Sequence, residues 1–306
     1  MWFFFANAAH SAVQIIYESI NLKNMEILLA DKAGFCFGVK RAINTAFEAA
    51  ARGRIFCLGP LIHNPQEVER LRRAGVETVD DFSSLKPGDF LIIRSHGVPP
   101  RVLAEARDRG LTIIDLTCPF VGKAQRDAEA LKKEGYQVVV VGEKKHPEVQ
   151  SILGYAGGSA VVVERAEDTE DLEFHSRLGV VAQTTQTYGN FSEIVLKLLR
   201  LSKELKIYNT ICSSTKERQD AARVLAGQVD VMLVVGGRNS ANTSRLADLC
   251  RQEGKPTYHI EVADEIRHEW LKGANKVGVT AGASTPDWVV EGVINKLIAE
   301  GGKVGR

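Results

Sequence analysis

The sequence has little net charge, few cysteines and no long hydrophobic run. Thirty-nine basic side chains stand against 38 acidic ones, so the formal charge of +1 creates no global field for nucleic acid or an anionic membrane. Five cysteines, spread between Cys36 and Cys250, do not form the pattern of a disulfide-rich secreted domain. Fractions of 44% apolar and 25% charged residues exclude a disordered chain, a collagen and a coiled coil. We expect a globular protein of a reducing compartment, the cytoplasm, whose anion sites are local.

Two common motifs are also missing. The cysteines show neither CxxC spacing nor a ferredoxin-type run, so local spacing alone does not predict a metal site. The glycine-rich segment VGGRNS lacks the GxGxxG spacing of a dinucleotide-binding loop. The sequence therefore shows no flavin or nicotinamide fingerprint.

The first 24 residues differ from the rest of the chain. They begin with an aromatic cluster, have no clear basic region or cleavage site of a signal peptide, and are too polar for a membrane span. From Met25 the sequence reads MEILLAD, a short apolar run that is typical of a buried strand. We expect translation to start at Met25, with residues 1–24 a mis-assigned gene start or else a loose N-terminal extension; an extra N-terminal helix is the alternative.

From Met25 onward, strand-like apolar runs alternate with segments of helical period, which predicts α/β architecture with parallel sheets. The expected strands are Arg54–Gly59, Phe90–Arg94, Leu111–Leu116, Gln137–Gly142, Val229–Gly236 and Lys276–Thr280. The expected helices include Val121–Glu134, Phe191–Glu204, Glu217–Ala226 and Trp288–Ala299.

A long-period repeat runs through the chain. Cys36, Cys118 and Cys212 each stand just before an expected helix, and each is followed by a strand that ends in glycine, at Gly59, Gly142 and Gly236. A second strand then runs into polar residues, in LIIRSHG, GVVAQTT and GVTAGAS. Turns at strand ends form the usual ligand-binding edge of an α/β sheet. We therefore predict three similar α/β units arranged as a pseudo-threefold trefoil around a central site. Their expected boundaries are 25–117, 118–208 and 209–306, the last including a C-terminal tail.

The three repeated cysteines are candidate metal ligands. A helix N-terminus stabilises a thiolate, and soft thiolates select zinc or an iron–sulfur cluster. Three sulfurs on one axis would leave one coordination position open. The alternative is three buried, inert cysteines. Cys57 and Cys250 fit that alternative and are left out of the site.

The strand ends carry imidazole, amide and hydroxyl groups suited to a phosphate or diphosphate. They are His63, His96 and His146, with Ser240, Asn242 and Ser284 in the third unit. His10, His175, His259 and His268 are expected to be bystanders. Glu148 follows His146 at the start of an expected helix and is a candidate proton donor, or else an ordinary first-turn acid. Thr184 and Thr185 are placed to orient it or a substrate hydroxyl.

In these motifs the chain resembles the 4-hydroxy-3-methylbut-2-enyl diphosphate reductase (LytB) family, from Met25 to about Glu300. The motifs are GFCFGV, IHN, SHGV, TCP, KKHPEV, QTT, IC followed by Thr215 and Arg218-Gln219, NSANT and AGASTPD. The resemblance implies a three-lobed fold of α/β units. It also implies reductive dehydroxylation of the allylic diphosphate to isopentenyl and dimethylallyl diphosphate.

The resemblance implies roles for particular residues. Cys36, Cys118 and Cys212 would hold a [4Fe–4S] cluster with one iron lacking a protein ligand. Glu148 would supply protons and Thr184 would position it, with Thr215 also lining the pocket. The diphosphate would be held by His63, His96, His146, Ser240, Asn242 and Ser284. The family often has Ser at the position of Ala241, so a phosphate contact there is expected to be absent or made by backbone N–H. A ferredoxin or flavodoxin would donate electrons.

Two other functions use the same groups. One is a zinc-dependent, non-redox phosphate-ester enzyme, which would bind zinc and act without a reductant. The other is an iron–sulfur sensor or electron carrier, which would leave the histidines and hydroxyls at the strand ends unexplained.

Overall fold

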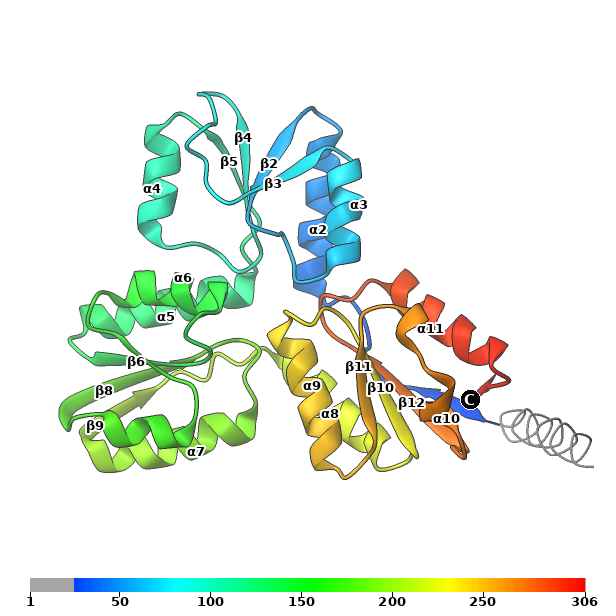
Figure 1. Ribbon diagram of the computed structural model, residues 1–306. Helices are drawn as coiled ribbons and strands as arrows, with labels where there is room; N and C mark the ends of the chain where they lie inside the picture. Colours follow the sequence, from blue (N-terminus) through cyan, green and yellow to red (C-terminus); the bar gives the residue numbers. More distant parts are fainter. Residues whose placement is uncertain (1–24, 306) are drawn as a thin grey trace, which may run out of the picture. The chain divides into compact units, whose positions relative to one another are not determined.

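The computed structural model describes residues 25–305, so the predictions for residues 1–24 lie outside the described part of the chain. The chain divides into two compact units, one of residues 36–216 and the other of residues 25–35 and 217–305. The described residues form three sheets, whose printed strand pairings are all parallel (Figure 1). The predicted α/β fold class with three sheets is confirmed.

The first two sheets belong to the unit of residues 36–216 and share one strand order. The first sheet runs β3-β2-β4-β5 and the second runs β7-β6-β8-β9. The strands are β2 (Ile55–Leu58), β3 (Val76–Val79), β4 (Phe90–Ile93), β5 (Thr112–Asp115), β6 (Gln137–Val141), β7 (Val161–Val163), β8 (His175–Ala182) and β9 (Ser202–Ile207). The helices are α2 (Phe37–Ala50), α3 (Pro65–Arg73), α4 (Pro100–Asp108), α5 (Pro119–Lys133), α6 (Pro147–Ala156), η1 (Ala166–Asp171), α7 (Tyr188–Leu198) and η2 (Leu199–Leu201).

The third sheet repeats this order with a strand from the other end of the chain. It runs β11-β10-β12-β1-β13, so β1 occupies the place that β5 and β9 hold in the other sheets. Its strands are β1 (Glu26–Leu29), β10 (Val231–Val235), β11 (Thr257–Ile260), β12 (Lys276–Ala281) and β13 (Lys303–Val304). The accompanying helices are α8 (Ser213–Ala226), α9 (Ala241–Gln252), η3 (Ala263–Glu265), α10 (His268–Leu271) and α11 (Asp287–Ala299).

The place of β1 corrects one predicted boundary. The sequence assigned residue 25 onward to the first α/β unit, but β1 pairs with β12 and β13 and has no place in the first sheet. The strand that follows β12 in the chain, β13, is only two residues long and pairs with the far side of β1, so the place beside β12 is open to β1. The apolar run at Ile27 fills that position because it is buried on joining the sheet.

The second correction concerns the expected helix Phe191–Glu204. The helix ends at Leu198, and β9 begins at Ser202 after a short 3₁₀ turn. Ile194 and Leu198 face the core, which gives the segment its helical period. The following residues pair in register with β8, for example Leu205 with Leu178. Tertiary pairing therefore overrides the helical propensity of the leucine- and lysine-rich sequence.

Alternate residues of the central strands pack against helices on opposite faces of the sheet. In β6, Val138 and Val140 pack with α5 and α6, whereas Val139 and Val141 pack with α7 (Figure 1). In β10, Met232 and Val234 join the cluster that contains α8 and α9 residues, and Leu233 joins the cluster of α11. Runs such as QVVVV are apolar without alternation because both faces are covered.

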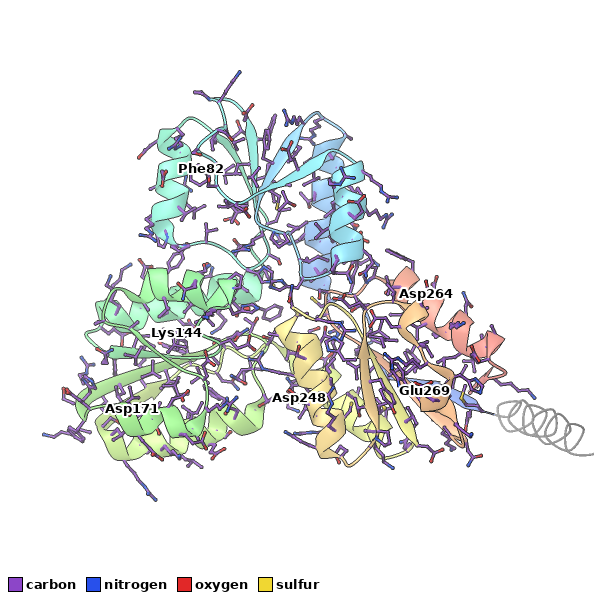
Figure 2. All side chains as sticks on the ribbon, in the orientation of Figure 1. Phe82, Lys144, Asp171, Asp248, Asp264 and Glu269 are labelled. Atoms are coloured by element: carbon purple, nitrogen blue, oxygen red, sulfur yellow. The ribbon has the colours of Figure 1, made fainter. Side chains whose placement is uncertain are left out.

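The first sheet also has a buried apolar face, because Phe82, labelled in Figure 2, packs with Leu91 and Ile93 of β4. The labelled Lys144 and Asp171 are exposed and belong to the segments after β6 and in η1 of the second sheet's part of the chain.

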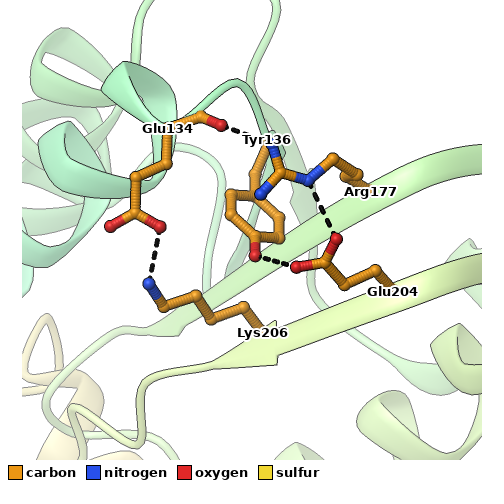
Figure 3. A network of polar contacts seen from close by, with 5 residues as sticks. All are labelled: Glu134, Tyr136, Arg177, Glu204 and Lys206. Atoms are coloured by element: carbon orange, nitrogen blue, oxygen red, sulfur yellow. Dashed lines mark hydrogen bonds and ion pairs between the residues drawn. The ribbon is translucent and has the colours of Figure 1, made fainter.

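A polar network lies where the strands of the second sheet begin, away from their carboxyl ends. Arg177 lies opposite Glu204 in register, and its Nε donates to Glu204 Oε2 at 3.0 Å (Figure 3). Tyr136 donates its hydroxyl to Glu204, and Lys206 Nζ lies 2.6 Å from Glu134 Oε2. This network fastens the end of α5 to β8 and β9, leaving the opposite sheet edge available for a site.

Candidate functional site

Cys36, Cys118 and Cys212 each follow the same strand of a sheet and precede a helix. Cys118 comes after β5, Cys212 comes after β9, and Cys36 comes after β1. Cys36 is the N-cap of α2, where its Sγ accepts from the Val39 amide at 3.5 Å, and Cys118 is the N-cap of α5. The predicted position of each cysteine just before a helix is confirmed.

The three thiols lie close enough to interact electrostatically. Burial raises the pKa of Cys118, the backbone N–H groups of Phe120 and Val121 oppose this rise, and Cys36 and Cys212 add to it. All three cysteines are free of disulfides and only half-buried. They belong to the same compact unit of residues 36–216. The fold therefore brings together three thiols that are 82 and 94 residues apart in sequence (118 − 36 and 212 − 118).

Gly38 permits the close approach of α2 to this cluster. A Cβ placed on Gly38 would lie 2.8 Å from Cys118 Sγ, closer than real Cβ contacts occur. Beside Cys118 there is a cavity of about 320 Å³, whose lining includes Thr117, Gly122 and Arg126. The sulfur of Cys118 is thus packed against backbone on one side and next to open space on another.

The three predicted histidines form a compact cluster. The ring centroids of His63 and His96 are 4.4 Å apart, and that of His146 lies 5.4 and 5.5 Å from them. One ring nitrogen from each lies within 4.8 Å of the others. His63 follows β2, His96 follows β4 and His146 follows β6, so the first and second sheets meet here.

Burial makes two of these imidazoles, those of His63 and His96, poor bases. The pKa of His63 is lowered to about 4, by burial and by the charge of Arg94. The pKa of His96 is lowered well below its usual value, by burial, by His63 and His146, and by Arg94. The two rings are therefore neutral at neutral pH, and each has one N–H to donate.

Glu148 is buried and held by two elements. Its carboxylate accepts the Thr184 amide at 2.6 Å and the Thr184 hydroxyl at 2.9 Å. Its own amide donates to His146 Nδ1 at 3.2 Å, so His146 caps α6. The Cys212 amide donates to the Thr184 carbonyl at 2.9 Å. A continuous set of hydrogen bonds therefore links a histidine, the acid, the threonine and a cysteine.

A parallel connection exists in the first sheet. The Cys118 amide donates to the Ser95 carbonyl at 2.9 Å, and Ser95 directly precedes His96. In the first and second sheets, the cysteine after the last strand is therefore hydrogen-bonded to the loop that follows the neighbouring strand. Thr215, one turn into α8, is buried and donates its amide to the Cys212 carbonyl at 2.9 Å.

The third sheet carries the predicted hydroxyl and amide groups in the equivalent loops. Ser240 caps α9, and the Ser284 hydroxyl lies 3.4 Å from the Ser240 hydroxyl. The side-chain amide of Asn242 is buried, yet neither of its polar atoms has a hydrogen-bond partner among the described residues. A buried amide without a partner is costly, which is typical of a group that meets a polar ligand.

The remaining cysteines have no part in this arrangement. Cys57 is buried within β2, and burial raises the pKa of its thiol to about 12. Cys250 is buried on α9, with the pKa of its thiol raised by burial to about 11. Of the other histidines, His259 contacts the Gly236 carbonyl and His268 pairs with Glu300, while His10 lies outside the described residues.

Two residues of this region were not predicted from the sequence. Gly38 lies within a helix, where alanine is the better helix former. A glycine in an expected helix was the sequence feature that could have indicated close packing there. Arg94 ends the strand-like run LIIR directly before Ser95 and His96, and a cation beside an expected anion site was its signal.

The residues present fit an iron–sulfur centre. Three thiols lie near one another at helix beginnings, and backbone N–H groups of Phe120 and Val121 point at one sulfur. Thiolate ligands with backbone N–H donors to sulfur are the usual surroundings of such a cluster. The described part of the chain offers no fourth cysteine at this place, because Cys57 and Cys250 are buried in strand and helix.

The fold and site define a class, namely three-sheet α/β proteins with three cysteines at helix beginnings, a histidine cluster and a buried acid. Two of the cysteines, Cys118 and Cys212, are hydrogen-bonded to the loops of His96 and Thr184. Residues 27–298 match the family described as LytB protein. The chain belongs to the LytB protein family.

Two curated relatives carry the same name. A 4-hydroxy-3-methylbut-2-enyl diphosphate reductase of Geobacter sp. (strain M21) is 51% identical over 276 residues, covering 90% of this chain and 98% of the relative. The reductase of Aquifex aeolicus (strain VF5) is 47% identical over 284 residues, with 90% and 98% coverage.

Solved structures give the same family. A terminal enzyme of the non-mevalonate pathway, (E)-4-hydroxy-3-methyl-but-2-enyl diphosphate reductase, is 46% identical with a TM-score of 0.67, covering 90% of this chain and 99% of its own. The reductase from Plasmodium falciparum is 28% identical with a TM-score of 0.85, covering 89% and 87%. In the described residues, no helix has the length and apolar character needed to cross a membrane.

Proposed function

We propose that this protein reduces 4-hydroxy-3-methylbut-2-enyl diphosphate to isopentenyl diphosphate and dimethylallyl diphosphate, the last step of the methylerythritol phosphate route to isoprenoids. The reaction takes up two electrons and two protons, breaks the allylic C–O bond and releases water. Family membership and the name shared by the relatives support the activity. The structural observation that carries it is the hydrogen-bonded set of His146, Glu148, Thr184 and Cys212.

Cys36, Cys118 and Cys212 would hold a [4Fe–4S] cluster, with one iron lacking a protein ligand. When bound, that group supplies electrons and a Lewis-acidic position for the substrate hydroxyl. The chain contributes the helix beginnings, whose N–H groups favour the negative charge on sulfur. Gly38 contributes space, because any larger residue would press on Cys118.

The histidine cluster would bind the diphosphate. His63 and His96 are neutral, so each would donate its one N–H to a phosphate oxygen as an uncharged ring. Ser240, Asn242 and Ser284 stay predicted diphosphate ligands. The buried amide of Asn242, which lacks a partner among the described residues, supports a polar ligand at that place.

Glu148 would deliver a proton to the leaving hydroxyl. Its carboxylate is buried and held by both donors of Thr184, so its position is fixed before the substrate arrives. Thr184 acts by positioning this acid, and Thr215 lines the same region behind Cys212. The C–O bond then breaks with water, not hydroxide, as the leaving group.

Electrons would come from a small external carrier, a ferredoxin or flavodoxin of the cytoplasm. The reason is that the chain shows no motif for a flavin or nicotinamide of its own. The identity of this donor rests on the family resemblance alone.

The test is metal analysis followed by turnover. Protein purified without oxygen is expected to contain about four iron and about four acid-labile sulfide ions per chain. It is then expected to convert the allylic diphosphate with a reduced dye as donor. A reversible cluster with no substrate turnover would instead indicate an electron carrier or sensor.

One observation favours a second function. The three histidines share ring nitrogens within 4.8 Å, a spacing at which neutral imidazoles also bind zinc. Bound zinc, no sulfide and hydrolysis of a phosphate ester without reductant would replace the reductase by a zinc enzyme.

A further inference from the structure

Arg94 is held at the carboxyl ends of two neighbouring strands. It directly follows β4, and its guanidinium lies against Gly59, which directly follows β2. A Cβ on Gly59 would lie 2.5 Å from an Arg94 guanidinium nitrogen, and Gly59 has a φ of +70°. The glycine therefore leaves room for the guanidinium to pack against its backbone.

No anionic partner neutralises Arg94 among the residues that the structure describes. Its side chain is half-buried and takes part in none of the ion pairs, and its Nε is buried without a hydrogen-bond partner. Burial lowers the pKa of Arg94, and Cys57 opposes this change. The Cys57 thiol is protonated at neutral pH because burial raises its pKa to about 12, so it is no counter-ion.

Arg94 lies between the loops that carry His63 and His96. Arg94 stands two residues before His96, and its guanidinium packs against Gly59, four residues before His63. The Ser95 hydroxyl donates to the Leu61 carbonyl at 3.0 Å, which joins these two loops, and the charge of Arg94 helps to lower the pKa values of His63 and His96. These two rings are neutral at neutral pH and supply donors without charge. Arg94 therefore brings a fixed positive charge to a group of neutral donors.

We infer that Arg94 is an anion-binding residue, which supplies the permanent positive charge for the diphosphate beside His63 and His96. A half-buried guanidinium without an anion is costly to fold, and a phosphate oxygen repays that cost. Its planar set of N–H donors matches phosphate geometry, which a lysine does not. The identity of the anion as a diphosphate rests on the proposed function, whereas the anion site itself does not.

The test is calorimetric titration of inorganic pyrophosphate into the cluster-loaded protein. Arg94→Met is expected to weaken binding by about tenfold to a hundredfold, the range for a hydrogen bond to a charged group. Arg94→Lys keeps the charge but loses the fork, so its affinity is expected to fall between the two. Arg101→Met removes the same charge from an exposed position on α4 and is expected to bind as wild type.

Wild-type affinity in a folded Arg94→Met protein would overturn the inference. If that variant does not fold, Arg94→Gln takes its place, because it keeps a polar group, and wild-type affinity there has the same meaning. If Arg94→Met weakens pyrophosphate binding but the wild-type protein shows no reductase turnover, the anion site stands and the proposed function fails. If the wild-type protein turns over and Arg94→Met changes neither its KM nor its pyrophosphate affinity, the proposed function stands and the anion site fails.

Discussion

The backbone amide and the hydroxyl of Thr184 donate to the two carboxylate oxygens of Glu148, at 2.6 and 2.9 Å. The two residues are 36 positions apart and come from different strand ends of the second sheet. The backbone of the acid is fixed in the first turn of α6, and its carboxylate is oriented by a loop from a neighbouring strand.

Replacing the acid tests its role as proton donor. Glu148→Gln keeps the shape and the contact with the Thr184 hydroxyl, but it has no acidic proton. We expect turnover to fall by about 10²–10⁴-fold, with iron and sulfide content unchanged. Anaerobic assays with a reduced dye measure the first, and metal analysis measures the second. Normal turnover would remove Glu148 from the mechanism.

Replacing the threonine separates positioning from packing. Thr184→Val keeps the volume and the amide donor but loses the hydroxyl, so kcat is expected to fall by about tenfold. Thr184→Ser restores the donor and should restore most of kcat. If the serine variant is as slow as the valine variant, the hydroxyl is not what orients Glu148.

The cysteines divide into two kinds, which iron analysis distinguishes. Cys118→Ala is expected to lose the cluster and the activity, because two thiolates cannot hold it. Cys57→Ala is the matched control, since Cys57 is buried in β2 and interacts with Arg94 instead. We expect that control to keep its iron while losing about 1 kcal/mol of unfolding free energy. An intact cluster without Cys118 would contradict the ligand assignment.

Gly38 gives a variant that should still fold but lose metal content. Gly38→Ala favours the helix by about 1 kcal/mol, but its Cβ would lie 2.8 Å from Cys118 Sγ. We expect a protein that folds and carries much less iron. Gly292→Ala on α11 is the control, because a Cβ there meets nothing within 4 Å. Equal iron in the two variants would show that the thiol can move aside.

The histidine cluster predicts how stability depends on pH. The pKa of His63 is about 4 in the folded protein and 6.5 in its ordinary state, so the unfolded chain binds more protons between these values. Protonation of His63 therefore does not reduce the free energy of unfolding above pH 6.5, but it lowers that free energy as the pH drops from 6.5 toward 4. His63→Asn should flatten this dependence, measured by urea unfolding at several pH values. An unchanged slope would place the sensitivity in other groups.

Much of the fold could be predicted because each repeated unit carries local signals. Strands such as Gln137–Val141 are continuous apolar runs covered on both faces, and cysteine positions before helices follow from the repeat. The segment after Leu198 could not be predicted, because its pairing with β8 depends on partners distant in sequence. The same holds for β1, whose partners lie near the other end of the chain.

The candidate site divides in the same way. The residue types at strand ends could be predicted, because parallel strands place their carboxyl ends at one edge. The contacts of Gly38 and Arg94 could not, because a missing Cβ or a missing counter-ion has meaning only when the neighbours are known.

The pairing of β1 with β12 also sets an order of events during synthesis. Glu26–Leu29 lies near the N-terminus and is synthesised early, whereas its partners Lys276–Val279 are synthesised late. The first two sheets close with local strands and can form while the chain grows. The apolar Ile27 cannot be buried against its partner Val277 until the third sheet has been synthesised. The third sheet therefore cannot be completed until the C-terminal part of the chain has been synthesised.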